Sequence, residues 1–284
     1  MRKKLSILLV LLIVSLISFG CGKSKVSSSE NTSTASDISQ QGSDESSQNA
    51  NQDKSQQNKN EEDEITEEDK QKKENEKYII CIDPGHQTKG DMSEEPVAPG
   101  SSETKFKVSW GTQGVSTNIP EYELNLQASK ILRQYLEDMG FTVIMTRETN
   151  DVNITNAERA TFANDNGADL VIRIHADGAE DSSVSGASLH IPASNGEYTK
   201  NIYEESNKCA QIMFSDMKEA GFKVRDIYER GDLTGFNWSK VPAVLVEMGF
   251  MSNPEEDERM ADKSYQEKMM KSIAEATQTY FEQK

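Results

Sequence analysis

The chain has 284 residues, with 48 acidic and 31 basic side chains and a formal charge of −17 at pH 7. A nucleic-acid partner requires a basic face against the phosphate backbone, so a chain this acidic is not expected to bind nucleic acid. None of its three cysteines forms a C-x-x-C pair, which argues against a disulfide scaffold and against a cysteine-rich zinc site. The length allows one or two domains.

The first 20 residues have the pattern of a secretion signal. Basic residues at positions 2–4 precede an almost wholly apolar run from Leu5 to Ile17. A membrane-spanning helix needs about 20 apolar residues, so this run is too short to span comfortably. It fits the apolar centre of a signal peptide, which we expect over residues 1–20.

The end of this leader resembles the lipobox of bacterial lipoproteins. Gly20 is followed at once by Cys21 and then by a Ser-rich stretch. In that family the cysteine is acylated and becomes the mature N-terminus, although Ser18 stands where the family usually has Leu. The resemblance implies a lipid on Cys21 and an extracytoplasmic protein anchored to the bacterial membrane. The alternative is an ordinary secretory leader with an incidental cysteine.

Residues 21–76 are predicted to be a disordered tether. Of the 55 residues in 22–76, 24 are Ser, Asn or Gln and none is aromatic. Such a segment cannot bury enough apolar surface to offset the entropy lost on ordering. As a flexible coil it would span about 40 Å on average. The acidic run 61–69 is expected to be solvated, with a frayed helix as the alternative. The segment is either a tether of functional length or a filler, and both predict disorder.

From residue 77 onward, apolar runs of strand-like and helix-like period alternate. Strands are predicted over residues 78–82, 141–145, 170–174, 187–191 and 241–246. Helices are predicted over residues 124–139, 157–163, 202–220 and 265–280. This alternation predicts one α/β domain over residues 77–284, with a mostly parallel twisted sheet flanked by helices.

Two histidines follow predicted strands. His86 comes after the first strand and His175 after the third. In parallel α/β sheets, sites form at the carboxyl ends of strands, so the two imidazoles can converge on one metal. A catalytic zinc ion has three protein ligands, and Glu121 and Glu123, at the start of the next helix, are both candidates for the third. On the residues alone, two unrelated structural histidines remain an alternative.

The fifth strand delivers a glutamate, Glu247, after five consecutive apolar residues. Burial at such a position raises the pKa of a carboxyl group, which suits a general base near neutral pH. A salt bridge to a nearby lysine or arginine is the structural alternative.

Residues 78–284 resemble the zinc-dependent N-acetylmuramoyl-L-alanine amidases of bacterial cell walls, the amidase type 3 family. The matching motifs, in order, are Ile82 to His86, Glu121 with Asn125-Leu126, Thr146-Arg147, Asn156 to Arg159, His175-Ala176, and Pro242 to Asn253. The resemblance implies one Zn²⁺ per domain, held by His86, Glu121 and His175, in a phosphorylase/hydrolase-like fold. Glu247 takes the catalytic position, and Glu123 does not fall at the family's spacing.

The resemblance also implies the reaction and the substrate. The substrate is peptidoglycan, and the bond is the amide between the lactyl group of N-acetylmuramic acid and L-alanine of the stem peptide. Zinc lowers the pKa of a bound water toward about 7, and Glu247 accepts its proton and passes it to the leaving amine. Two alternatives remain: another zinc peptidase acting within the stem peptide, or a non-catalytic wall-binding lipoprotein. No protein activator can be identified from the sequence.

Further residues are candidates for the surroundings of the site. The segment 87–120 is expected to lie beside the cleft, where Trp110 either stacks on substrate or anchors the loop. Asp177 either orients a ligand or caps the turn that follows it. His190, in the fourth strand, is expected at the substrate rim or in a structural role. Arg147, in the Thr-Arg motif, is a candidate for supporting the site or for its rim.

Overall fold

The computed structural model describes residues 66–284; Cys21, the predicted signal peptide and most of the predicted tether lie outside the described residues. Six strands form the central sheet in the order β4-β1-β5-β8-β6-β7. Neighbouring strands run parallel except β6 and β8, which are antiparallel. The strands are β1 (Ile79–Pro84), β4 (Thr142–Met145), β5 (Leu170–Asp177), β6 (Ala187–Pro192), β7 (Val224–Arg230) and β8 (Ala243–Phe250). The predicted α/β fold with a mostly parallel sheet is confirmed.

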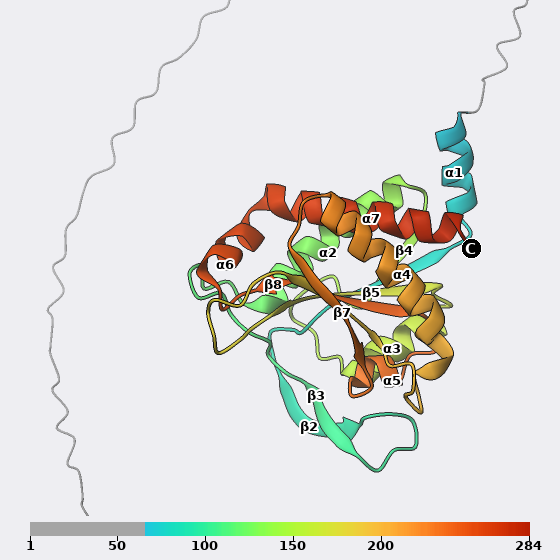
Figure 1. The fold of residues 1–284 in the computed structure, drawn as a ribbon. Helices are drawn as coiled ribbons and strands as arrows, with labels where there is room; N and C mark the ends of the chain where they lie inside the picture. Colours follow the sequence, from blue (N-terminus) through green and yellow to red (C-terminus); the bar gives the residue numbers. More distant parts are fainter. Residues whose placement is uncertain (1–65) are drawn as a thin grey trace, which may run out of the picture. The chain divides into compact units, whose positions relative to one another are not determined.

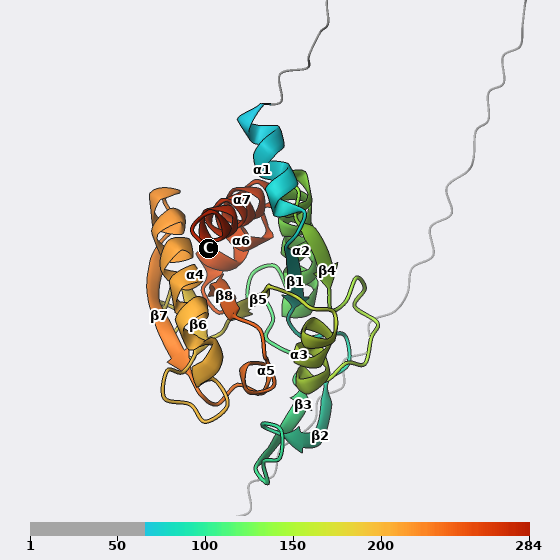
Figure 2. The same ribbon diagram turned by 90° about the vertical axis from the view of Figure 1, so that its right-hand side faces the viewer.

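Helices cover both faces of this sheet (Figure 1). The long helices α2 (Glu121–Asp138), α4 (Lys200–Glu219) and α7 (Lys263–Glu282) pack on one face, with α6 (Pro254–Ala261) leading into α7. The shorter α3 (Asn156–Asp165) and α5 (Thr234–Asn237) lie on the other face (Figure 2). The domain therefore has three layers, with the sheet in the middle.

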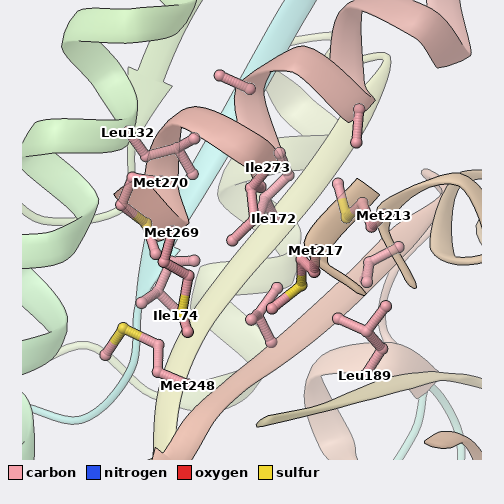
Figure 3. Close-up of a cluster of buried hydrophobic side chains, with 14 of the residues drawn as sticks. Leu132, Ile172, Ile174, Leu189, Met213, Met217, Met248, Met269, Met270 and Ile273 are labelled. Atoms are coloured by element: carbon pink, nitrogen blue, oxygen red, sulfur yellow. The ribbon is translucent and has the colours of Figure 1, made fainter. Parts of the chain in front are cut away.

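The main core lies between the sheet and the three long helices. Ile172 and Ile174 alternate along β5 and meet Met269 and Ile273 of α7 (Figure 3). Alternate residues of the same strand, such as Val171, face the second cluster under α3 and α5. Both faces of β5 are covered, which explains why its predicted part is apolar at every position except Arg173 rather than at alternate positions.

Residues 67–75 form a helix, α1 (Glu67–Asn75), where the composition predicts disorder. Thr66 and Asp69 form a reciprocal capping box at its start, with Thr66 Oγ1 accepting from Asp69 N at 3.1 Å. At its end, the buried Asn75 side chain donates to the Met139 carbonyl oxygen at 2.8 Å. The prediction of a disordered tether up to residue 76 is wrong for these residues, because caps and side-chain pairs form a helix that has no apolar face.

The segment 87–120 contains a second, two-stranded sheet that the sequence analysis did not predict. Antiparallel strands β2 (Asp91–Pro96) and β3 (Thr104–Val108) extend away from the central sheet (Figure 1). The hairpin is attached to the domain near its turn, at the end of β2: Glu95 Oε1 accepts from Ala157 N at 3.2 Å, and Trp238 Nε1 donates to the Pro96 carbonyl at 2.9 Å. The elements β7, α5 and α6 were also not predicted.

Across residues 66–284, no helix combines the length and the apolar character needed to cross a bilayer.

Candidate active site

The carboxyl ends of three adjacent strands carry the site. His86 follows β1, His175 lies near the end of β5, and Glu247 lies on β8 directly opposite His175 in the strand register. Glu121 is the first residue of α2 and is 3% exposed. The topology of the sheet therefore gathers four side chains that are far apart in the sequence, as expected at the carboxyl edge of a parallel sheet.

His86, Glu121 and His175 form one cluster. Their candidate ligand atoms all lie within 4.8 Å of one another. Glu121 Oε1 is 3.1 Å from His86 Nε2 and 3.2 Å from His175 Nδ1. The two imidazole rings meet edge to face, with centroids 4.9 Å apart. Of the two glutamates that the sequence offers as third ligand, Glu121 lies in the cluster, whereas Glu123 is exposed on the helix surface.

The protein fixes the orientation of the first histidine. His86 Nδ1 lies 2.9 Å from the Ser109 carbonyl oxygen, and because a carbonyl only accepts, Nδ1 is the protonated nitrogen. Nε2 is therefore the nitrogen with a free lone pair, and it faces Glu121. The backbone at His86 is left-handed, with φ of 60°. An outer hydrogen bond of this kind sets the tautomer and the ring direction of a metal-binding histidine.

The loop that carries His86 leaves no room for a side chain at Gly85. A Cβ atom there would collide with the ring of His175. The buried Arg147 holds the same loop from behind, donating through Nε to the Pro84 carbonyl at 2.9 Å and through Nη2 to the Gly85 carbonyl at 2.9 Å. A third hydrogen bond reaches the Tyr122 carbonyl in the first turn of α2 at 2.7 Å. Arg147 thus joins the two backbone segments that present His86 and Glu121, and it lies behind the site rather than at its rim.

A buried carboxylate and two arginines underlie the site. Asp83 on β1 makes ion pairs with Arg159 and Arg173, both at 2.8 Å. Burial opposes ionisation of Asp83, but the charges of the two arginines outweigh it and hold the pKa of this carboxyl well below its usual value. Arg159 also donates to the His86 carbonyl oxygen at 2.9 Å, which links this group to the ligand loop.

The pKa of Glu247 is shifted in the opposite direction from that of Asp83. Burial, followed by the nearby negative charges of Glu121 and Asp177, raises the pKa of Glu247 well above its ordinary value. Its Oε2 atom is buried and has no hydrogen-bond partner among residues 66–284. A carboxyl group with a raised pKa and a free oxygen, placed beside the His–Glu–His cluster, can accept and return a proton.

The cluster fits a zinc ion by its chemistry. Two imidazoles and one carboxylate are a known ligand set of catalytic zinc. Burial lowers the pKa of His175 to about 4, so its imidazole is neutral, as a metal ligand must be. For Glu121, burial is outweighed by the contacts with His175 and His86, which lower its pKa well below the usual value, so it is a carboxylate. His175 Nε2 is a buried nitrogen with no partner within the described part of the chain.

The remaining predicted residues lie around this centre. Asp177 ends β5 and accepts from the Gly178 amide at 2.7 Å, while its side chain lines the mouth of the site. His190 lines a cavity with Glu247, and Arg230 lies 3.3 Å from its Nδ1. Trp110 is 54% exposed and follows Ser109, the residue that accepts from His86.

Two charged residues near the site, Asp83 and Arg230, were missed. Asp83 follows four apolar residues in its strand, so the reasoning applied to Glu247 could have found it. Arg173 interrupts an apolar strand, a pattern that indicates a paired arginine, and it pairs with Asp83. Arg230 ends β7, a strand whose exposed edge gives it too many polar residues to be recognised.

The comparisons agree with this geometry. The sequence profile of the amidase type 3 family, described as N-acetylmuramoyl-L-alanine amidase, matches residues 80–279. An N-acetylmuramoyl-L-alanine amidase of Mycobacterium tuberculosis is 28% identical over 203 residues, which cover 69% of this chain and 83% of the relative. The amidase AmiA of Escherichia coli is 24% identical over 249 residues, which cover 75% of this chain and 79% of that protein.

A solved structure shares the fold. The crystal structure of the N-acetylmuramyl-L-alanine amidase Ami1 from Mycobacterium abscessus, in its apo form, matches with a TM-score of 0.66 and 25% sequence identity. The match covers 72% of this chain and 99% of that one. The profile match spans the sheet, the His–Glu–His cluster and Glu247, and this chain therefore belongs to the N-acetylmuramoyl-L-alanine amidase family.

Proposed function

We propose that this chain is a zinc-dependent amidase that hydrolyses the bond between the lactyl group of N-acetylmuramic acid and L-alanine in peptidoglycan. The observation that carries the proposal is the position of Glu247, directly opposite His175 in the strand register and beside a His–Glu–His cluster. Membership of the amidase family supports the bond and the substrate.

His86, Glu121 and His175 would hold the zinc ion. When bound, zinc supplies Lewis-acid chemistry, because it polarises the amide carbonyl and lowers the pKa of water in the site. Ser109 fixes the His86 ring, and Arg147 holds the backbone of both ligand-bearing segments. The protein thereby keeps the three ligands in one arrangement before substrate arrives.

Glu247 moves the proton. As a carboxylate it accepts a proton from the attacking water at Oε2, the oxygen that no other described side chain occupies. It then returns this proton to the nitrogen of L-alanine as the C–N bond breaks, and the product is a free amine. The raised pKa of Glu247 favours holding the proton between the two steps. No covalent intermediate is needed.

The proposal extends to the location of the enzyme. The lipobox-like sequence supports a signal peptide over residues 1–20 and a lipid anchor on Cys21 in the cell envelope. The polar segment from residue 21 to the start of α1 would act as a tether, which lets the catalytic domain reach peptidoglycan away from the membrane.

Metal removal and return tests the proposal. Purified peptidoglycan is incubated with the full-length chain as prepared, after chelation, and after chelation followed by Zn²⁺. The proposal expects new free amines on L-alanine in the first and third samples and a loss of release in the second. Equal release after chelation, with the metal content shown to be below one tenth per chain, would contradict the role of zinc.

A further inference from the structure

Two cavities adjoin the His–Glu–His cluster, and both include His86, His175 and Glu247 in their walls. The first has a volume of about 490 Å³, and its mouth carries the acidic Asp177 and Glu180. The second has a volume of about 240 Å³, and its cationic side chains are Arg173 and Arg230. The catalytic centre therefore lies between an acidic side and a basic side.

Each arginine of the second cavity belongs to a group that keeps a net positive charge. Asp83 is shared between Arg173 and Arg159, so one carboxylate balances two guanidinium groups. Asp232 is likewise shared between Arg230 and Lys105. Such an excess of cations, within a domain that is acidic as a whole, creates a local site for an anion.

The guanidinium of Arg230 is held in place. Asp232 accepts from its Nε at 2.8 Å and from its Nη2 at 2.9 Å, in a two-pronged pair. Nη1 lies 3.3 Å from His190 Nδ1 on the neighbouring strand. Lys105, from the β2–β3 hairpin, contacts Asp232 at 3.3 Å from the other side. A pre-positioned guanidinium binds a carboxylate with less loss of side-chain entropy than a free one.

The second guanidinium is fixed by packing. Arg173 Nε donates to Asp83 Oδ2 at 2.8 Å, which leaves both terminal nitrogens for other acceptors. Gly235 of α5 lies against this guanidinium, where a Cβ atom would collide with it. Thr234 and Asn156 add polar side chains to the same cavity wall.

We infer that the basic cavity binds the stem peptide and that Arg230 recognises its first carboxylate beyond L-alanine, while the uncharged sugar lies on the acidic side. This inference rests on the proposed function, because it assigns the two sides of the scissile amide to the two cavities. A guanidinium favours a carboxylate over a carboxamide, since only the former offers a full negative charge to a charge-assisted hydrogen bond. Arg230 is therefore a specificity-determining residue, which distinguishes a stem peptide with a free carboxylate at this position from one with a carboxamide.

The test uses two substrates that differ only at the α-carboxyl group of the second residue. In N-acetylmuramoyl-L-alanyl-D-glutamate this group is a free carboxylate, and in N-acetylmuramoyl-L-alanyl-D-isoglutamine it is a carboxamide. For the zinc-loaded full-length chain we expect kcat/KM to be about 10-fold or more higher for the carboxylate. Arg230→Met should bring the ratio close to one, mainly by raising KM for the carboxylate substrate. Arg230→Lys should give an intermediate ratio, because it keeps the charge and loses the planar geometry.

Arg225→Met is the matched control, because it removes an exposed cation from the same strand outside this cavity. It should leave the ratio at the wild-type value. Equal rates on both substrates in the wild type, or a ratio that Arg230→Met does not change, would overturn the inference.

A binding measurement separates this inference from the proposed function. Calorimetry with L-alanyl-D-glutamate and L-alanyl-D-isoglutamine needs no turnover, and we expect tighter binding of the first, lost in Arg230→Met. If neither muramoyl substrate is cut while this preference is present, the proposed reaction fails and the anion site stands. If cleavage occurs and the dipeptides bind equally, the anion site fails and the reaction stands.

Discussion

His175 and Glu247 lie directly opposite each other on the neighbouring parallel strands β5 and β8. One is a member of the His–Glu–His cluster and the other is the carboxyl group with the raised pKa. Strand pairing, rather than a flexible loop, therefore sets the separation of the proposed base, Glu247, and the proposed metal ligand, His175. A site built on paired strands keeps its geometry better than one built on loops.

The first prediction concerns the general base. Glu247→Gln keeps the size of the side chain and removes its ability to accept a proton. We expect kcat to fall by about 100-fold or more, with the zinc content unchanged at one per chain. The measurement is stem-peptide release together with metal analysis of the same sample. Glu148→Gln is the matched control, because Glu148 is exposed and pairs with Arg133 rather than with the cluster. Near-normal turnover by Glu247→Gln would remove Glu247 from its assigned role.

The second prediction separates the histidines. His86→Ala removes a ring from the cluster and should lose both zinc and activity. His190→Ala should retain zinc, because His190 contacts Ser188 and Arg230 rather than the cluster. Zinc stoichiometry after dialysis against a weak chelator distinguishes the two variants. Retention of a full zinc equivalent by His86→Ala would contradict the ligand assignment.

The third prediction tests the close packing at Gly85. In Gly85→Ala, the added methyl group collides with the His175 ring and must displace it. We expect zinc affinity to fall about 10-fold or more while the circular dichroism spectrum stays that of the folded domain. Gly231→Ala is the control, because a Cβ atom there meets only ordinary contacts. Equal zinc affinities in the two variants would contradict this prediction, because they would show that the His175 ring can move aside without loss of zinc binding.

The fourth prediction is a pH dependence of stability. Asp83 has a folded-state pKa held well below the usual value by Arg159 and Arg173, against the effect of burial. In an unfolded chain an aspartate has a pKa of about 3.9. The ionised form thus stabilises the fold fully above that pH, and the contribution declines as the pH falls toward the folded-state pKa.

Asp83→Asn should therefore cost about 3–5 kcal/mol at pH 7, because two buried arginines lose their counter-charge. The difference in unfolding free energy between wild type and variant should shrink at pH 3. Urea denaturation at both pH values measures it, with the exposed Asp151→Asn as the control. A difference that stays constant from pH 7 to pH 3 would show that Asp83 is not the titrating group.

The sequence predicted the strands that are buried on both faces. Ile79 to Ile82 is an unbroken apolar run, and Leu170 to Ile174 is apolar except for Arg173; such runs indicate a buried strand whatever element packs against them. The histidines and Glu247 could be placed for the same reason, because each comes at or near the end of a buried strand. The family resemblance then chose Glu121 over Glu123, which the residues alone left open.

The elements that were missed depend on contacts between distant segments, which the local sequence pattern does not indicate. The β2–β3 hairpin is largely polar. It is held near its turn by hydrogen bonds from two distant segments, from the Ala157 amide to Glu95 and from the Trp238 indole to the Pro96 carbonyl. Helix α1 has no apolar face and depends on the Thr66 cap and on Asn75 binding to another helix. The basic cavity was missed because Arg173 and Arg230, which are far apart in the sequence and lie on β5 and β7, line one cavity only in the folded domain.

Mass spectrometry of the products from purified peptidoglycan tests the central claim most directly. The zinc-loaded full-length chain should release intact stem peptides that begin with a free L-alanine amine, and should leave the glycan strands uncut. Fragments cut within the stem peptide, with the lactyl–L-alanine bond intact, would contradict the assignment of this site to the amidase reaction.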